Sequence, residues 1–198
     1  VGPVYDWPKL LLWGLADFDA VVYLDADTLP IGREPLEALF DGVADAPFAA
    51  VAFGRDSEVN NGVFALRPSR DVRRCLISHA FNGSFVRDPE FARRGGTWQA
   101  FLDLFWIGAS PRVSWKGEVH HFRGFWRPDC TALAAPAAPH RVLPDRFNFP
   151  ASFSAMSRGS PVASQVAARW AQELAEGPVH ILHWVGGLRI TGTGHVLV

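Results

Sequence analysis

The chain has 198 residues, of which 48% are hydrophobic and 20% are charged, a composition that suits one globular domain and excludes a disordered chain. Its 19 basic and 20 acidic residues nearly cancel, so the overall charge does not favour nucleic acid or an anionic membrane as a partner. No apolar run approaches the roughly 20 residues of a transmembrane helix. We therefore interpret residues 1–198 as a single domain with no nucleic-acid partner and no membrane contact from this segment.

The first thirty residues predict a helix that leads into a buried strand. Leucine and aromatic residues follow Pro8 at helical spacing as far as Phe18, and the apolar run 20–24 is typical of a buried strand. Side chains alternate between the two faces of a strand, so Asp25 and Asp27 are expected on the same side. Two neighbouring carboxylates repel one another, and a divalent metal is the simplest compensation. An acidic loop exposed to water is the alternative interpretation.

The rest of the chain alternates predicted helices and strands, which indicates an α/β fold. A short helix is expected from Glu34 to Gly42, and Ser69 is a typical N-cap for the helix after it. The other expected elements are strands at 47–53 and 62–68, helices at 69–81 and 97–106, a long surface excursion at 117–139, an extended segment at 141–149, a helix at 160–177 capped by Ser160, and a last strand at 179–187.

Two other patterns are weak candidates for metal binding. Cys75 and Cys130 stand far apart without the close spacing of a zinc site, and we interpret them as thiols, with a disulfide as the alternative. His120 and His121 are adjacent, so on a strand they would face opposite ways, and no carboxylate stands near them at ligand spacing. We therefore expect no second metal site.

Polar residues next to two predicted strands are the remaining candidates for a site. "NNGVFALRPS" places Asn60 and Gly62 just before a strand, where a plain turn is the alternative interpretation. "HILHWVGGLR" places His183 on an apolar strand, followed by two glycines and Arg189. A histidine can join two carboxylates around a metal, glycines let a backbone approach a ligand closely, and an arginine can clamp a diphosphate. The alternative for His183 is a hydrogen-bonded core residue.

Four stretches of the chain stand in an order that one enzyme family shares. They are "KLLLWGLADFDAVVYLDADTL", "NNGVFALRPS", "LPDRFN" and "HWVGGLR". The first resembles the lysine, leucine-rich helix, strand and Asp-x-Asp block of glycosyltransferase family eight, the glycogenin-like and galactinol-synthase-like enzymes. The others resemble its Asn-Ser-Gly-Val strand, its Leu-Pro…Asn stretch and its His-x-x-Gly-x-x-Lys signature. The resemblance implies a GT-A fold, a mixed and mostly parallel sheet flanked by helices that binds a nucleotide-diphospho-sugar.

The resemblance also implies roles for individual residues. Asp25 and Asp27, with His183 as the third ligand, would hold Mn²⁺ or Mg²⁺. The implied catalytic residues are Lys9 and Asn60, which would contact the donor sugar or its diphosphate, and Gln99. The residues implied to contact the UDP-sugar donor are Asp25, Ala26, Asp27, Asn61, Gly62, Gly186 and Arg189. Arg189 stands where the family usually has lysine, which keeps the charge and changes its shape from a point to a planar fork.

The chain departs from the family's pattern in two places. Where the family usually reads Gly-Gly-Asp-Gln-Gly, this chain reads "GGTWQAF", so Trp98 replaces an aspartate implied to contact the donor or the reaction centre. Asp88, Glu90 or Asp103 would then have to supply the carboxylate. The second departure is that the family's N-terminal part, with the strand and loop that hold the uracil base, has no counterpart here. We therefore expect a GT-A domain that is incomplete at its N-terminus.

Together these patterns predict a metal-dependent retaining glycosyltransferase that moves a hexose from a UDP-sugar to a hydroxyl of a glycan, a polyol or a protein. One alternative is a GT-A-like module that binds sugar nucleotides or glycans after losing turnover. Another is a haloacid-dehalogenase-type phosphatase, because "VVYLDADTL" also resembles that superfamily's first motif, with Asp25 as nucleophile and Asp27 as acid and base. The pattern suits a cytoplasmic enzyme and the lumenal part of a Golgi enzyme equally, and it leaves the oligomeric state open.

Overall fold

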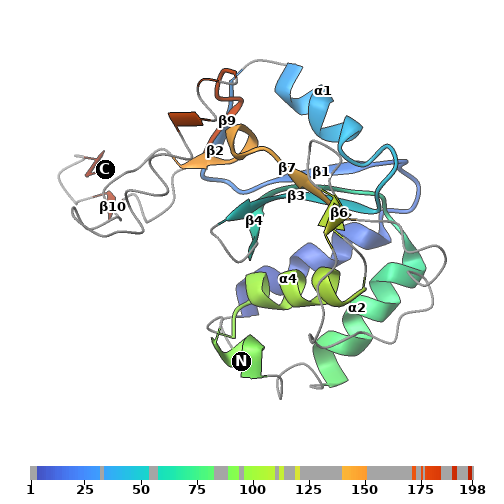
Figure 1. Cartoon of the computed structure of the whole chain (residues 1–198). Helices are drawn as coiled ribbons and strands as arrows, with labels where there is room; N and C mark the ends of the chain where they lie inside the picture. Colours follow the sequence, from blue (N-terminus) through green and yellow to red (C-terminus); the bar gives the residue numbers. More distant parts are fainter. Residues whose placement is uncertain are drawn as a thin grey trace.

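A six-stranded mixed sheet forms the centre of the chain (Figure 1). In this computed structural model the described residues are 4–31, 34–53, 58–82, 89–93, 96–109, 112–113, 119–120, 140–150, 171–172, 175, 177–183, 189–190 and 196–197. The strands lie in the order β1 (Val21–Leu24), β4 (Glu58–Leu66), β3 (Phe48–Phe53), β7 (His140–Leu143), β5 (Arg112–Val113) and β6 (Val119–His120). Parallel pairing joins β3 to β7 and β7 to β5 in the middle, and antiparallel pairing joins the strands towards both edges.

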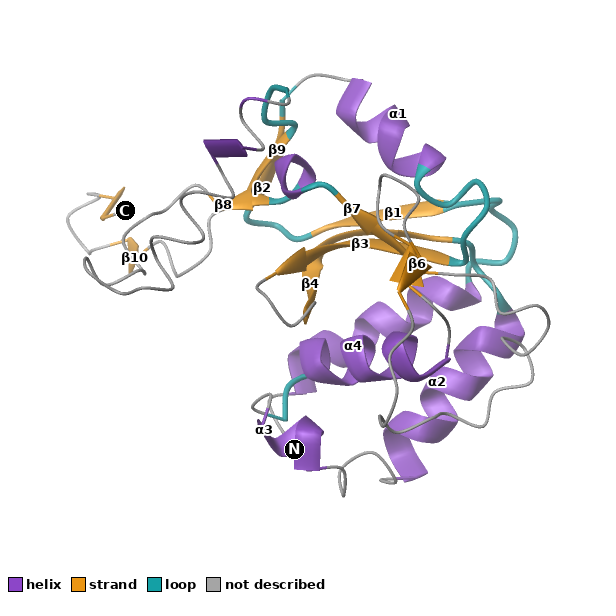
Figure 2. Cartoon of the chain, viewed as in Figure 1, coloured by secondary structure: helices purple, strands orange, loops and turns teal. Residues whose placement is uncertain are grey.

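Helices cover both faces of this sheet, which confirms the expected mixed α/β architecture (Figure 2). One face carries the 3-10 helix η1 (Val4–Gly14), α2 (Arg70–Asn82) and α4 (Trp98–Ala109), with α3 (Pro89–Arg93) against α4. The other face carries α1 (Glu34–Asp41) and the 3-10 turn η4 (Asp145–Phe147).

Alternating side chains of β3 and β4 divide the core between the two faces. Phe48 and Phe64 pack with Trp13 and Trp106 on the side of α2 and α4, and the ring centroids of Phe48 and Trp106 lie 4.9 Å apart. Their strand neighbours, such as Ala49 of β3, turn to the side of α1 instead. This period-two pattern is what two covered faces require.

The first helix differs from the prediction in type and in starting point. It is a 3-10 helix that begins at Val4 and contains Pro8, whereas the apolar spacing predicted a helix after that proline. Leu10 and Trp13, three residues apart, share its buried side, which matches the three-residue period of a 3-10 helix. Trp13 thereby anchors η1 in the core.

The predicted start of α2 is confirmed, and one strand start is corrected. The hydroxyl of Ser69 accepts a hydrogen bond from the Val72 amide at 3.3 Å, so Ser69 caps α2. Strand β4 begins at Glu58, four residues earlier than predicted, so Asn60 and Gly62 lie inside a strand and not in a turn before it. A register shift between Ala50 and Ala52 of β3 accommodates this early part of β4.

A second, three-stranded sheet stands at the end of β1 and organises the site. It joins β2 (Thr28–Pro30), β9 (Ile181–His183) and β8 (Phe149–Pro150), with β9 in the middle. Strand β9 is not the last one, because β10 (Arg189–Ile190) and β11 (Val196–Leu197) follow it and pair antiparallel. The three-stranded sheet brings residues from both ends of the chain together.

Some of the predicted features lie outside the described residues, and one is wrong. Most of the surface excursion at 117–139 and of the helix at 160–177 falls outside, as do His121 and Cys130. Cys75, half-buried on α2, is disulfide-bonded, so its interpretation as a thiol is wrong. Among the helices that the structure describes, none combines the length and the apolar character needed to cross a bilayer.

Candidate functional site

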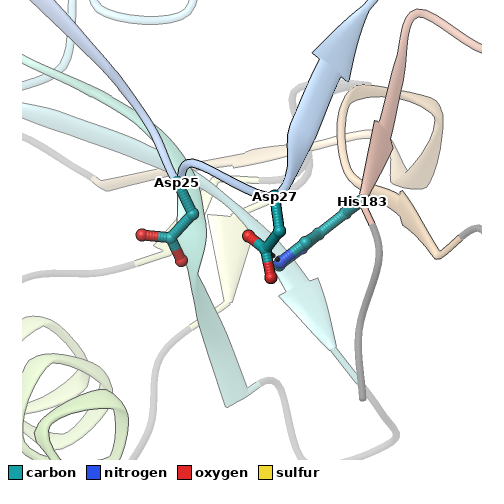
Figure 3. A group of neighbouring side chains, drawn as sticks. All are labelled: Asp25, Asp27 and His183. Atoms are coloured by element: carbon teal, nitrogen blue, oxygen red, sulfur yellow. Dashed lines mark ion pairs between the residues drawn. The ribbon is translucent and has the colours of Figure 1, made fainter. Parts of the chain in front are cut away.

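The two aspartates flank a turn between β1 and β2. The Thr28 amide and hydroxyl both donate to the Asp25 carbonyl, at 3.0 and 2.7 Å, and these bonds close the turn directly after β1. The prediction that the backbone stays extended from Asp25 to Asp27 is therefore wrong. The side-chain hydrogen bond of Thr28 stabilises a turn at this point in place of an extended strand. The turn still directs both carboxylates to one region (Figure 3).

Pairing between β2 and β9 brings a histidine to this turn. Thr28 lies opposite His183 in the antiparallel register, so Asp27 and His183 become neighbours. The Nε2 atom of His183 lies 3.3 Å from Oδ1 of Asp27. One ligand atom from each of Asp25, Asp27 and His183 lies within 4.8 Å of the other two (Figure 3). The structure thus assembles the three residues that the sequence singled out.

The chemistry of this group fits a divalent metal. Carboxylate oxygens with one imidazole nitrogen suit Mn²⁺, and carboxylates with water suit Mg²⁺. Asp27 is exposed, Asp25 is half-buried and His183 is buried, so the group is anchored on one side and open on the other. A ligand that bridges to such a metal would arrive from the side of Asp27.

Lys9 and Tyr23 both hold the carboxylate of Asp25 through hydrogen bonds. The Lys9 ammonium donates to Oδ1 at 2.9 Å and the Tyr23 hydroxyl donates to the same oxygen at 2.7 Å. Oδ2 accepts no hydrogen bond from the described part of the chain. Lys9 is only 7% exposed and also donates to the carbonyl of Asn61 at 3.2 Å. One carboxylate oxygen is therefore fixed while the other remains available.

Tyr23 was not predicted as a site residue. Its signal is its position two residues before Asp25, which on a strand puts both side chains on one face. Its ring stacks on Phe64 at 4.8 Å and lies 4.7 Å from the Lys9 ammonium nitrogen. The hydroxyl is thereby aimed at the carboxylate by a ring that is packed in place.

The asparagines of β4 support the backbone around the site. The side-chain oxygen of Asn60 accepts from the Gly62 amide at 2.8 Å, and the Gly62 carbonyl accepts from the Asp25 amide at 2.8 Å. Asn60 thus fixes the segment that holds Asp25. The predicted contacts of Asn60 and Asn61 with the donor stay predictions, and in this structure Asn61 offers its carbonyl to Lys9.

Asn148 is a second residue that the sequence reasoning missed. Its side-chain oxygen lies 2.7 Å from Nδ1 of His183, and both residues are buried. The signal was available in "LPDRFNF", where Asn148 stands between two phenylalanines that are both buried. A polar side chain placed between apolar neighbours at that depth requires a hydrogen-bonding partner.

The residues around the Trp98 departure belong to the core. Trp98 is 6% exposed and packs on Phe101 with ring centroids 5.2 Å apart. Asp103 is fully buried and accepts a hydrogen bond from the Val59 amide at 3.0 Å, so its carboxylate supports the backbone of β4. Gln99 is half-buried on α4. The proposed replacements Asp88 and Glu90 have side chains outside the described part.

Three of the predicted donor contacts stay predictions. Ala26 is exposed in the turn between the two aspartates. Gly186 lies outside the described residues, and the backbone of Arg189 pairs with β11 while its side chain is not described.

Comparison with known proteins gives similar sequences from two strains of one yeast species and several similar folds. Residues of this chain are 34% identical to glycogenin-1 of Saccharomyces cerevisiae over 82 residues, which is 39% of this chain and 13% of that protein. The solved structure of the glycosyltransferase GlyE of Streptococcus pneumoniae matches with a TM-score of 0.52 at 16% identity, over 97% of this chain and 40% of that one. Mouse xyloside xylosyltransferase 1 matches with a TM-score of 0.50 at 13% identity, over 91% of this chain and 63% of that one.

These matches differ in what they cover. This chain spans about an eighth of the yeast protein and less than two thirds of either solved structure. No family model matches the sequence. The two structural matches show the fold, and the sequence match shows relatedness over its 82 residues.

Proposed function

We propose that this chain, glycogenin-like in sequence and built on the GT-A fold, is a glycosyltransferase that uses a divalent metal to bind a UDP-sugar. The observation that carries the proposal is the convergence of Asp25, Asp27 and His183 at the carboxyl end of β1. In open α/β sheets, ligands bind outside the carboxyl ends of strands. The glycosyltransferase names of the similar proteins favour this activity over the phosphatase alternative.

The three ligands and their supports have distinct tasks in this proposal. Asp25, Asp27 and His183 would hold Mn²⁺ or Mg²⁺, which when bound neutralises charge on a leaving diphosphate. Lys9 adds a buried positive charge beside Asp25, which favours an anionic ligand at the same place. Asn60 holds the backbone of Gly62, to which Asp25 is hydrogen-bonded, and Tyr23 holds Oδ1 of Asp25 directly. Arg189 would clamp the diphosphate with its guanidinium group.

The finer assignment follows the resemblance of the sequence. We propose that the donor carries a hexose, that the acceptor is a hydroxyl of a glycan, a polyol or a protein, and that the anomeric configuration is retained. No side chain of the described residues is assigned as a nucleophile. The preferred metal is Mn²⁺, because an imidazole completes the ligand set.

The test is UDP release from a panel of UDP-sugars, measured with and without Mn²⁺. We expect release from at least one donor that requires the metal and is lost in Asp27→Asn. Asp45→Asn is the matched control, since Asp45 is an exposed aspartate that pairs with Arg141 at 2.7 Å and takes no part in the site. Release that does not depend on metal, or that survives Asp27→Asn, would contradict the metal assignment.

A second candidate function is binding of sugar nucleotides without turnover. The burial of Trp98 in the core, at the position where the family resemblance implies an aspartate, favours it. Mn²⁺-dependent binding of UDP, measured by calorimetry, together with no release from any donor would identify this binding module. Phosphate release from a phosphomonoester instead would support the phosphatase.

A further inference from the structure

Two groups that are not themselves proposed as metal ligands contact the imidazole of His183, one on each side. On one side the side-chain oxygen of Asn148 lies 2.7 Å from Nδ1. On the other side stands the backbone of Gly62, where an added Cβ would overlap Cε1 of the ring and lie 3.0 Å from Nδ1. The ring therefore occupies a slot between an amide and a glycine, with Nε2 facing Asp27.

Strand pairing fixes the position of Asn148 relative to His183. Asn148 directly precedes β8, and β8 runs parallel to β9 with Pro150 beside His183. The backbone amide of Asn148 donates a hydrogen bond to the Asp145 carbonyl at 2.9 Å, and this bond connects the residue to η4. The contact between the two side chains is thus set by backbone that is hydrogen-bonded on both sides.

The burial of Asn148 indicates that its side chain serves His183. The residue is 4% exposed, and its Nδ2 has no hydrogen-bond partner in the described part of the chain. A buried amide whose NH₂ group is unpaired is unfavourable for folding. Its oxygen, in contrast, makes a short bond to a buried ring nitrogen, so the contact with His183 is what this residue provides.

We propose that Asn148 is a positioning residue that selects the tautomer of His183 and aims its Nε2 lone pair at the metal. An amide oxygen only accepts hydrogen bonds, so Nδ1 of His183 must carry the hydrogen and Nε2 is the free ligand atom of the neutral ring. A partner on the second ring nitrogen commonly orients metal-binding histidines. The inference rests on the proposed function, because it needs His183 to bind the metal.

The test compares Asn148→Ala with Asn148→Asp in the full chain. Mn²⁺ affinity is measured by electron paramagnetic resonance of free Mn²⁺ in the presence of UDP. We expect Asn148→Ala to weaken Mn²⁺ binding by about 10- to 100-fold. Asn148→Asp should restore binding close to that of the natural chain, because a carboxylate oxygen accepts from Nδ1 as the amide oxygen does. Equal weakening in both variants would overturn the proposal.

A second readout addresses the tautomer directly and without metal. Nitrogen-15 chemical shifts of His183, assigned by their loss in His183→Ala, should show hydrogen on Nδ1 in the natural chain and a mixture of tautomers in Asn148→Ala. Hydrogen on Nε2 in the natural chain would overturn the proposal. Phe147→Leu is the structural control, since Phe147 is a buried neighbour in the same segment that does not contact His183 through a hydrogen bond. If Phe147→Leu weakens Mn²⁺ binding as much as Asn148→Ala, the proposal fails.

The same measurements separate this proposal from the proposed function. If His183→Ala weakens Mn²⁺ binding and Asn148→Ala does not, the positioning role is wrong and the metal site stands. If His183→Ala binds Mn²⁺ as tightly as the natural chain, the metal assignment fails and the positioning role fails with it.

Discussion

Gly62 of β4 lies against the imidazole ring of His183, so that a Cβ on Gly62 would overlap Cε1 of the ring. The two residues are 121 positions apart in the sequence. They meet because β4 pairs with β1, β9 pairs with β2, and a tight turn joins β1 to β2. Close approach of a backbone to a side chain is a recurrent reason for glycine in a strand. At this position glycine makes room for the ring of His183, the proposed third metal ligand.

Gly62→Ala should therefore disturb the site more than the strand. The added methyl group must push the ring of His183 away from its place, since the neighbouring Asn60 oxygen leaves no room on the other side. We expect Mn²⁺ affinity to fall at least about tenfold, as for loss of orientation of a ligand, and the free energy of unfolding to fall by about 1–3 kcal/mol from overpacking. Calorimetry with Mn²⁺ and urea unfolding measure the two effects.

The control for this prediction is Gly14→Ala. At Gly14 an added Cβ would meet the side chain of Arg73 at 3.1 to 3.3 Å, and that long side chain can shift. Gly14 lies at the end of η1, and the atoms that an added Cβ would meet all belong to Arg73 and none to the three proposed metal ligands. Unchanged Mn²⁺ affinity in Gly62→Ala would show that His183 tolerates displacement and does not bind the metal.

Tyr23→Phe tests whether the tyrosine hydroxyl orients Asp25. The substitution removes the 2.7 Å hydrogen bond to Oδ1 and keeps the stacking of the ring on Phe64. We expect a loss of about 1–3 kcal/mol in the free energy of unfolding, as for other hydrogen bonds to charged groups. Mn²⁺ affinity should fall about tenfold because Asp25 gains freedom to rotate. A fall in stability at constant Mn²⁺ affinity would mean that Lys9 alone orients the carboxylate.

Lys9 and Asp25 should be energetically coupled. Their side chains are 8% and 27% exposed and their charged atoms lie 2.9 Å apart, so water screens the pair only in part. A double-mutant cycle with Lys9→Met and Asp25→Asn, measured by urea unfolding, should give a coupling of about 1 kcal/mol or more. Removing either partner alone leaves the other without its charged neighbour.

The exposed pair Arg74 and Asp71 is the control for this cycle. Its atoms lie 3.2 Å apart on α2, but the side chains are 79% and 67% exposed. Exposed pairs of this kind are worth about 0.5 kcal/mol or less. A coupling between Lys9 and Asp25 no larger than that of the exposed pair would refute a special electrostatic role for Lys9.

The candidate ligands were predicted from two kinds of signal. Asp25 and Asp27 stand together after an apolar run, which is a local signal, whereas His183 was joined to them by the resemblance to glycosyltransferase family eight. The polar residues that hold these ligands were not predicted as such. The contact of Asn148 with His183 depends on the pairing of β8 with β9, and a pairing between residues 33 positions apart leaves no periodic signal in the sequence.

The errors in predicted backbone have similar causes. The turn after Asp25 forms because Thr28 hydrogen-bonds its carbonyl, which the alternation rule for strands does not consider. The early start of β4 follows from its pairing with β3, where Glu58 lies opposite Phe53, and not from the polar residues of β4 themselves. In both places a tertiary or side-chain hydrogen bond outweighed local preference.

The substitution Trp98→Asp should unfold the chain and not improve catalysis. It would place the aspartate that the family resemblance implies at a position that is 6% exposed in this chain and packed against Phe101. Removing a buried tryptophan side chain costs about 3–5 kcal/mol, and burying an unpaired carboxylate adds to that cost. Thermal unfolding of Trp98→Asp should therefore occur at a much lower temperature than that of the natural chain.

Trp98→Phe separates loss of packing from loss of function. Phenylalanine keeps an aromatic ring in the same pocket, so we expect a smaller fall in stability and unchanged Mn²⁺-dependent UDP binding. Trp98→Asp could instead fold with near-natural stability and release UDP faster from a UDP-sugar. That result would show that the core tolerates an aspartate at this position and that its absence limits turnover in this chain. If Trp98→Asp folds without any gain in release, the carboxylate at this position has no part in the reaction of this chain.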